Sequence, residues 1–261
     1  ERGLAPGQPG TGAPGQAATA GPRVKSFAID AHFTGLSWNP DGDIPGVANI
    51  SGSVSGNQDK GTYRLNGTKS GVDLPGVFAD PALRFDSLSL RGGWKRKPVG
   101  QANSFVELEI AEALLSNVDL ALNVHGSYRL QGPAGFADLS GRVERALGAR
   151  VERYLPMAIN EDTHTWLQKS LLAGDVRQGN FTLRGDLARF PFRTTRDGIF
   201  RVNAPVYGVH LRYSEDYPKI ENIDGLLTMD GVRMDIQSDK AQIFGAQLQK
   251  VHAVIPDLEA A

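Results

Sequence analysis

The chain has 261 residues, with 28 Lys and Arg against 29 Asp and Glu, and its formal net charge is −1. This balance excludes the broad positive field that nucleic-acid-binding proteins use, so we expect no nucleic-acid partner. The absence of cysteine excludes disulfides, thiolate metal sites and cysteine nucleophiles. No apolar stretch reaches the roughly 18 to 20 residues that cross a bilayer, so we expect any membrane anchor outside this chain. The first residue is Glu1 and the end follows an apolar run, 251–255, which suggests a fragment of a longer protein.

Residues 1–22 contain six Gly and four Pro and hardly any large apolar side chain. Such a composition cannot offset the entropy of ordering by burial, so it predicts a disordered linker or loop. From residue 23 on, apolar residues alternate with polar ones, as Phe27, Ile29 and Phe33 illustrate. A period of two is typical of half-buried strands. We therefore expect a β segment over 23–142 and a second one over 175–261 that continues the same sheet.

Four Asp-Gly dipeptides separate these alternating runs. Asp and Gly tolerate the positive φ of tight hairpin turns, so the dipeptides favour a meander of antiparallel strands. The predicted turns are Asp41-Gly42, Asp197-Gly198, Asp224-Gly225 and Asp230-Gly231.

Residues 143–174 interrupt the alternation and predict a pair of helices, 143–155 and 161–173. The first is expected because Val143, Leu147, Val151 and Leu155 recur every four residues and Pro156 follows them. For the second, Asn160 suits the N-cap and Gly174 the end. Trp166 is the expected anchor of this helix on the sheet.

No residue pattern demands catalysis, a metal or another cofactor. The five histidines are scattered, and none has the spacing of a metal site. The turn aspartates are explained by local backbone bonding. There is no Gly-Xaa-Ser-Xaa-Gly elbow and no phosphate-binding loop. We therefore expect no catalytic residue, no metal ligand, no cofactor and no enzyme activity.

Two short clusters have more than one interpretation. For the basic run 91–97, which contains Trp94, we expect a solvated hairpin tip; the alternative is a surface that stacks a base or contacts lipid headgroups. Phe190-Pro191-Phe192 fits an exposed interaction element, or else a strand edge or a plug in the core.

The most specific stretch resembles the signature region of the YhdP-type proteins, within the AsmA-like and TamB-like superfamily of bridge lipid-transfer proteins. The motif residues that carry this resemblance are Tyr154, Leu155, Pro156, Trp166, Leu167, Phe190, Pro191 and Phe192. The similarity extends over nearly everything after residue 22. One departure is Tyr217, where Trp is expected before Pro218.

The resemblance implies a mainly β fold: a long, curled, groove-forming antiparallel sheet with two short helices inserted. It further implies a periplasmic segment of an intermembrane phospholipid-transport protein, anchored to the inner membrane through another part of the same long chain and serving outer-membrane lipid homeostasis. Its partners would be phospholipid acyl chains and the rest of that chain. The expected lipid-facing residues are Phe181, Leu183, Phe200, Val202, Val209, Leu211, Met234 and Ile236.

Two other classes of function stay open. A structural or partner-binding β scaffold would close the same apolar faces by its own packing, and periodicity alone does not separate it from a lipid groove. A carbohydrate-active β enzyme would need a polar cleft with two converging carboxylates.

Overall fold

The structure is a computed structural model that describes residues 26–42, 44–99, 103–132 and 134–260. The described residues form thirteen strands in one antiparallel sheet, which confirms the predicted mainly β, curled fold. The predicted linker, 1–22, lies outside the described residues. The strands are β1 (Ala28–Trp38), β2 (Gly46–Asn57), β3 (Lys60–Asp73), β4 (Ala82–Val99), β5 (Asn103–Ser116), β6 (Leu120–Leu130), β7 (Phe136–Leu147), β8 (Leu171–Asp186), β9 (Gly198–Leu211), β10 (Ile220–Asp230), β11 (Arg233–Ile243), β12 (Ala246–Leu248) and β13 (Val251–Ile255). The helices are α1 (Glu161–Ser170) and three 3₁₀ helices, η1 (Gly148–Tyr154), η2 (Leu187–Arg189) and η3 (Leu258–Ala260).

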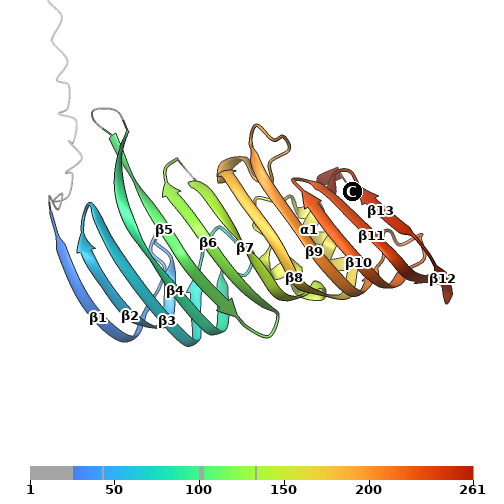
Figure 1. Ribbon diagram of the computed structural model, residues 1–261, viewed down its shortest axis with the longest axis horizontal. Helices are drawn as coiled ribbons and strands as arrows, with labels where there is room; N and C mark the ends of the chain where they lie inside the picture. The colour runs from blue at the N-terminus through green and yellow to red at the C-terminus, as the bar shows by residue number, and fades with distance from the viewer. Residues whose placement is uncertain (1–25, 43, 100–102, 133, 261) are drawn as a thin grey trace, which may run out of the picture.

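The strands follow one another across the sheet in sequence order from β1 to β12, and β13 pairs with β11 (Figure 1). The turn predicted at Asp230-Gly231 is confirmed, because Asp230 pairs with Arg233 and Gly231 has a φ of +58°. The turn predicted at Asp224-Gly225 is wrong. This dipeptide lies inside β10 at a shift of register, and a Cβ on Gly225 would lie 2.1 Å from the Gln237 carbonyl oxygen. The glycine there allows close approach of two strands and not a reversal of the chain.

Irregular residues inside the strands give the sheet its curl. Asn49, Lys69, Gln178 and Asn222 have φ values between +49° and +58° although they are not glycines. The pairing register shifts beside Asn49, Gln178 and Asn222. Bulges of this kind bend a strand and increase its twist, so their repetition across the sheet curves it into a trough.

The predicted pair of helices is only half correct. Residues 143–147 belong to β7, where Val143 pairs with Leu122 and with Gly179. A spacing of four suits one face of a strand as well as one face of a helix, and two neighbouring strands stabilise the strand. Residues 148–154 form η1, a 3₁₀ helix and not an α-helix.

The second helix is present as α1. The Asn160 side chain caps it by accepting a hydrogen bond from the Thr163 amide at 2.8 Å. It ends at Ser170, three residues earlier than expected, because residues 171–174 join β8. Gly174 therefore lies within a strand and does not end the helix.

Apolar side chains gather on one face of the sheet in two clusters. The N-terminal cluster centres on Ile50, Phe85, Leu88 and Leu120, with Tyr154 of η1 packed against it. The C-terminal cluster is larger and has Trp166 of α1 packed against it. Its buried members are Val206, Val209, Leu211, Ile223, Met234, Ile236, Ala241, Ile255 and Leu258. We call the face that carries both clusters the inner face.

Candidate functional site

An unbroken row of apolar residues crosses the inner face at right angles to the strands. Each member is the direct pairing partner of the next, so all point to the same side of the sheet. None of these residues is exposed. With one residue from each of β1 to β11 and one from β13, the row is Phe33, Gly52, Leu65, Leu90, Ala113, Val124, Gly141, Phe181, Val202, Met229, Met234 and Ile255. At about 4.8 Å between strands, it extends roughly 50 Å.

A second apolar row runs parallel to the first over β1 to β9. Its members are Ala31, Val54, Tyr63, Gly92, Ile110, Gly126, Leu139, Leu183 and Phe200. The inner face over these strands is therefore a continuous apolar strip at least two residues wide.

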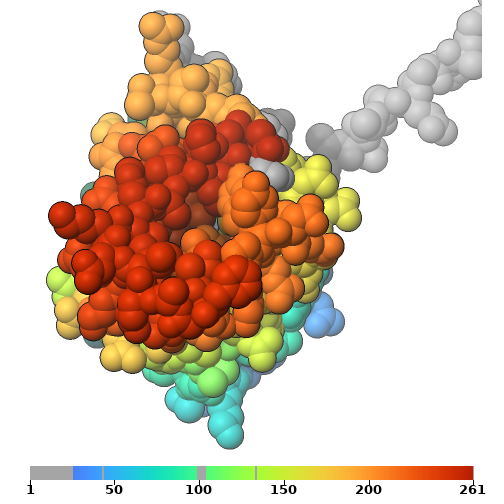
Figure 2. All heavy atoms as spheres, turned by 90° about the vertical axis from the view of Figure 1, so that its right-hand side faces the viewer, coloured from blue at the N-terminus to red at the C-terminus, as the bar shows by residue number. Residues whose placement is uncertain are grey.

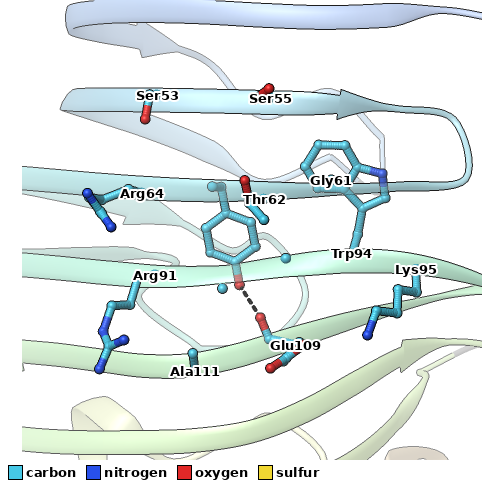
Figure 3. A pocket seen from close by; sticks show the side chains of 13 residues that line it. Ser53, Ser55, Gly61, Thr62, Arg64, Arg91, Trp94, Lys95, Glu109 and Ala111 are labelled. Atoms are coloured by element: carbon cyan, nitrogen blue, oxygen red, sulfur yellow. Dashed lines mark hydrogen bonds between the residues drawn. The ribbon is translucent and has the colours of Figure 1, made fainter.

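The aromatic side chains on this face lie over neighbouring glycines, and their polar atoms bond to the backbone. The Trp94 ring covers Gly61 (Figure 3), and its Nε1 donates to the Asn57 carbonyl at 2.9 Å. The Tyr63 hydroxyl donates to the Glu109 carbonyl at 2.8 Å, the bond drawn dashed at Glu109 in Figure 3. Burial first, and the Glu109 charge second, raise the pKa of Tyr63. The phenol thus stays neutral, and no charge interrupts the strip.

The opposite, outer face is polar. A row on that face contains His32, Ser53, Arg64, Arg91 and Glu112. In this row Arg91 and Glu112 form an ion pair of 3.0 Å. The basic run 91–97 lies within β4, so the expected hairpin tip is wrong.

Residues 148–170, which we call the crossing segment, pass over the inner face. The segment comprises η1, a short connection and α1. Its first part bonds to the β3–β4 loop, where the Met157 amide donates to the Val77 carbonyl at 2.8 Å. Its second part, α1, lies behind β9 and β10 in Figure 1.

Helix α1 connects the two rims of the trough over β9 to β11. One rim is the β10–β11 turn, and the other is the segment that follows β9. At its beginning, Thr163 Oγ1 donates to the Leu258 carbonyl at 2.7 Å, and the Leu258 amide donates to Val232 in the β10–β11 turn. From its middle, Trp166 Nε1 donates to the Tyr213 carbonyl at 3.0 Å, just beyond the other end of β9. Seen from the C-terminal end, the red strands and the orange segment surround a central depression (Figure 2).

The crossing segment divides the eight expected lipid-facing residues into two groups. Phe181, Leu183, Phe200 and Val202 lie in the two apolar rows and are half-buried. The other four residues also lie on the inner face, but they belong to the C-terminal core cluster. The exposed fractions of Val209, Leu211, Met234 and Ile236 are 4%, 4%, 8% and 4%.

The sequence-based list of lipid-facing residues left out the inner residues of β1 to β7. Phe33, Leu65, Leu90 and Val124 lie in the first row beside Phe181 and Val202. The alternating pattern already marked their strands, but only the pairing register places them in one line.

The expected family-motif residues lie in and around the crossing segment and at the β8–β9 connection. Tyr154 ends η1, Leu155 and Pro156 follow it, and Trp166 and Leu167 lie in α1. Phe192 is 3% exposed and covers Gly185 and Gly198, so its place is that of a core plug. Phe190 stacks edge-on against Phe200, with 5.2 Å between the ring centroids.

A buried carboxylate fixes the beginning of the crossing segment to the sheet. Asp119, which is 5% exposed, accepts hydrogen bonds from Arg153 Nη1 and from the Tyr154 hydroxyl, each at 3.1 Å. Burial raises the pKa of Tyr154, an effect partly offset by a hydrogen bond with Asn117 and reinforced by the Asp119 charge. The phenol therefore stays protonated and can donate.

We expect Asp119→Asn to lower the free energy of unfolding by about 1 to 3 kcal/mol, because one charged acceptor of a buried network is lost. Asp80→Asn is the matched control, since Asp80 also bonds to Arg153 but is exposed. It should cost less than about 1 kcal/mol. Denaturant unfolding measures both values. Equal effects of the two variants would show that Asp119 does not hold the crossing segment in place.

One hollow on the surface, about 580 Å³, is lined by polar and apolar groups in similar measure. Its walls include Arg64, Arg91, Lys95 and Glu109, the last being its one lining carboxylate (Figure 3). A smaller hollow of about 310 Å³ contains Asp86 and Asp119, but Asp119 is already bonded to Arg153 and Tyr154. Neither hollow offers two free carboxylates that converge on a cleft.

Within the described part of the chain, no group of three or more His, Asp and Glu side chains is arranged to hold a metal ion. The described helices also include none that is long and apolar enough to pass through a bilayer.

A single curled sheet with one polar face and one apolar, partly covered face defines the class of β-groove proteins, in which the apolar side of the sheet is not covered by a second sheet. The chain belongs to the YhdP protein family, whose model matches residues 10–261. It is similar to the intermembrane phospholipid transporter YhdP of Escherichia coli (strain K12), with 20% identity over 233 residues. That match covers 88% of this chain but 18% of the Escherichia coli protein. No solved structure matches the chain.

Proposed function

We propose that this chain is a periplasmic segment of an intermembrane phospholipid conduit, and that its inner face holds acyl chains while they slide between membranes. No bond is made or broken in this function. The inner-membrane anchor would lie in another part of the same protein. The observation that carries the proposal is the apolar row across the sheet, because it runs along the direction in which a lipid would travel.

The energetics of lipid transfer explain why such a row is needed. A diacyl lipid with about 30 methylenes would cost on the order of 25 kcal/mol to hold in water, at roughly 0.8 kcal/mol per methylene. Continuous apolar cover removes most of this cost. The two rows consist of apolar residues, glycines and Tyr63, whose hydroxyl is bonded to the Glu109 carbonyl, so they present no charged group to an acyl chain.

A closed structural scaffold is the second candidate function. It is favoured by one observation, the nearly complete burial of the C-terminal core cluster under α1. In that case the apolar face would stabilise the fold and bind no lipid. The difference between the two functions is therefore sharpest over β1 to β8, where the rows are half-buried.

We expect a photoreactive amino acid at Leu65 to crosslink phospholipid in the full-length protein, and the same amino acid at Arg64 to crosslink far less. Leu65 and Arg64 are neighbours in β3 but lie on the inner and outer faces, so local mobility and expression are matched. Mass spectrometry of the crosslinked product identifies the lipid. Equal labelling at the two positions would contradict the conduit and leave the closed scaffold.

A further inference from the structure

We infer that α1 is a displaceable gate, which occupies the place of an acyl chain over β9 to β11 and must leave the inner face before lipid can pass. This inference rests on the proposed conduit function. In this view the crossing segment controls whether lipid passes from the part of the trough over β1 to β8 to the part that begins at β9.

Position is the first argument. The apolar row continues beneath α1 without a break, from Val202 through Met229 and Met234 to Ile255. Over β9 to β11, however, the helix and Leu258 join the two rims of the trough. A lipid that follows the row thus meets the helix across its path.

The weak attachment of α1 is the second argument. The helix has ten residues, and its buried residues are polar, Thr163 and Ser170. Trp166 is its main apolar contact with the core cluster. A helix shorter than about 12 to 15 residues is marginal alone, so α1 depends on the Trp166 contact and on a few hydrogen bonds to the rest of the fold.

The independence of the sheet is the third argument. Strands β8, β9, β10 and β11 are hydrogen-bonded to one another along their length. The helix can therefore move without breaking a strand pair. Its departure would expose Val209, Leu211 and Ile223 to water, which is unfavourable unless another apolar group covers them. An acyl chain supplies that cover, so lipid and helix compete for one surface.

A reversible lock tests the gate. The Thr163 hydroxyl bonds to the Leu258 backbone carbonyl, and the chain has no cysteine of its own. Thr163→Cys with Leu258→Cys, oxidised to a disulfide in the full-length protein, should hold α1 against the far rim. Photoreactive amino acids are placed on the inner face at Leu65 in β3, before the gate, and at Ala253 in β13, beyond it.

In the locked protein we expect phospholipid crosslinking at Leu65 to persist and crosslinking at Ala253 to fall by about tenfold or more. A thiol reductant should restore the labelling at Ala253. The reduced double variant controls for folding, and Asn160→Cys with Glu259→Cys supplies a second lock at a different contact. A disulfide between Asn180→Cys and Asn203→Cys, which pair on the outer face, controls for oxidation and should leave both positions labelled.

Equal labelling at Ala253 in locked and reduced protein would overturn the gate. So would a reduced protein that labels at Leu65 but never at Ala253, because α1 would then be a fixed wall. Absence of label at Leu65 in every form has a different meaning, since it contradicts the conduit itself.

Discussion

Leu211→Asp is expected to unfold the C-terminal part of the sheet, with a loss of at least about 3 kcal/mol in the free energy of unfolding. Leu211 is 4% exposed and pairs with Leu171 and Ile220. It belongs to the cluster against which Trp166 packs. A carboxylate there has no cation to pair with inside the cluster, so it must be protonated or the core must open. Thermal unfolding followed by tryptophan fluorescence measures the effect.

Arg212→Asp is the matched control, because it places the same charge one residue further along at an exposed position. The Arg212 backbone amide donates to Ser170, and the substitution leaves this bond intact. We expect a change within about 0.5 kcal/mol. If Leu211→Asp unfolded no more easily than Arg212→Asp, the C-terminal core would not be closed by α1, and the gate would have no basis.

The strands could be predicted because a period of two is a local property of the sequence. Phe181 and Leu183, or Phe200 and Val202, alternate with polar residues, and the ladder keeps this alternation along each strand. The polar outer face follows from the same pattern. What alternation cannot give is the register between strands. For this reason the line from Phe33 to Ile255 is visible only when the pairing is known.

The error at 143–147 has a related cause. Val143 and Leu147 satisfy the spacing of a helix, but they lie between two strands whose backbone groups need partners. The hydrogen bonds to β6 and β8 decide in favour of a strand. Asn160, in contrast, is a local signal, since a cap bonds to the amide three residues later, and the start of α1 was predictable from it.

The sequence pattern could not predict the burial of Val209, Leu211, Met234 and Ile236. Their alternation is the same as that of Phe181, Leu183, Phe200 and Val202. The difference arises because α1 and Leu258, distant in sequence from most of these residues, meet over one part of the face. The candidate site is therefore a half-open strip whose open part depends on a contact between residues 95 positions apart.

Val202→Asp is expected to reduce phospholipid delivery by the full-length protein by about tenfold or more, while it costs less stability than Leu211→Asp. Val202 lies within the first row, between Phe181 and Met229, and is half-buried. A carboxylate at this place keeps water beside it, so the fold tolerates it better than a charge in the closed core. An acyl chain in the row must instead either strip water from the ion or leave the strip, and both are costly. Transfer of a labelled phospholipid between donor and acceptor vesicles bridged by the full-length protein measures delivery.

The control for Val202→Asp is Asn203→Asp, which adds the same charge to the next residue of β9 on the exposed outer face. It should leave delivery within about twofold of the parent, because no lipid meets that face and an exposed charge affects its surroundings little. Thermal unfolding of both variants separates obstruction from loss of fold. Two results would contradict the conduit for this segment: equal delivery by the two variants, or a Val202→Asp protein that unfolds as readily as Leu211→Asp. The second result would mean that β9 is sealed along its whole inner side, as a closed scaffold requires.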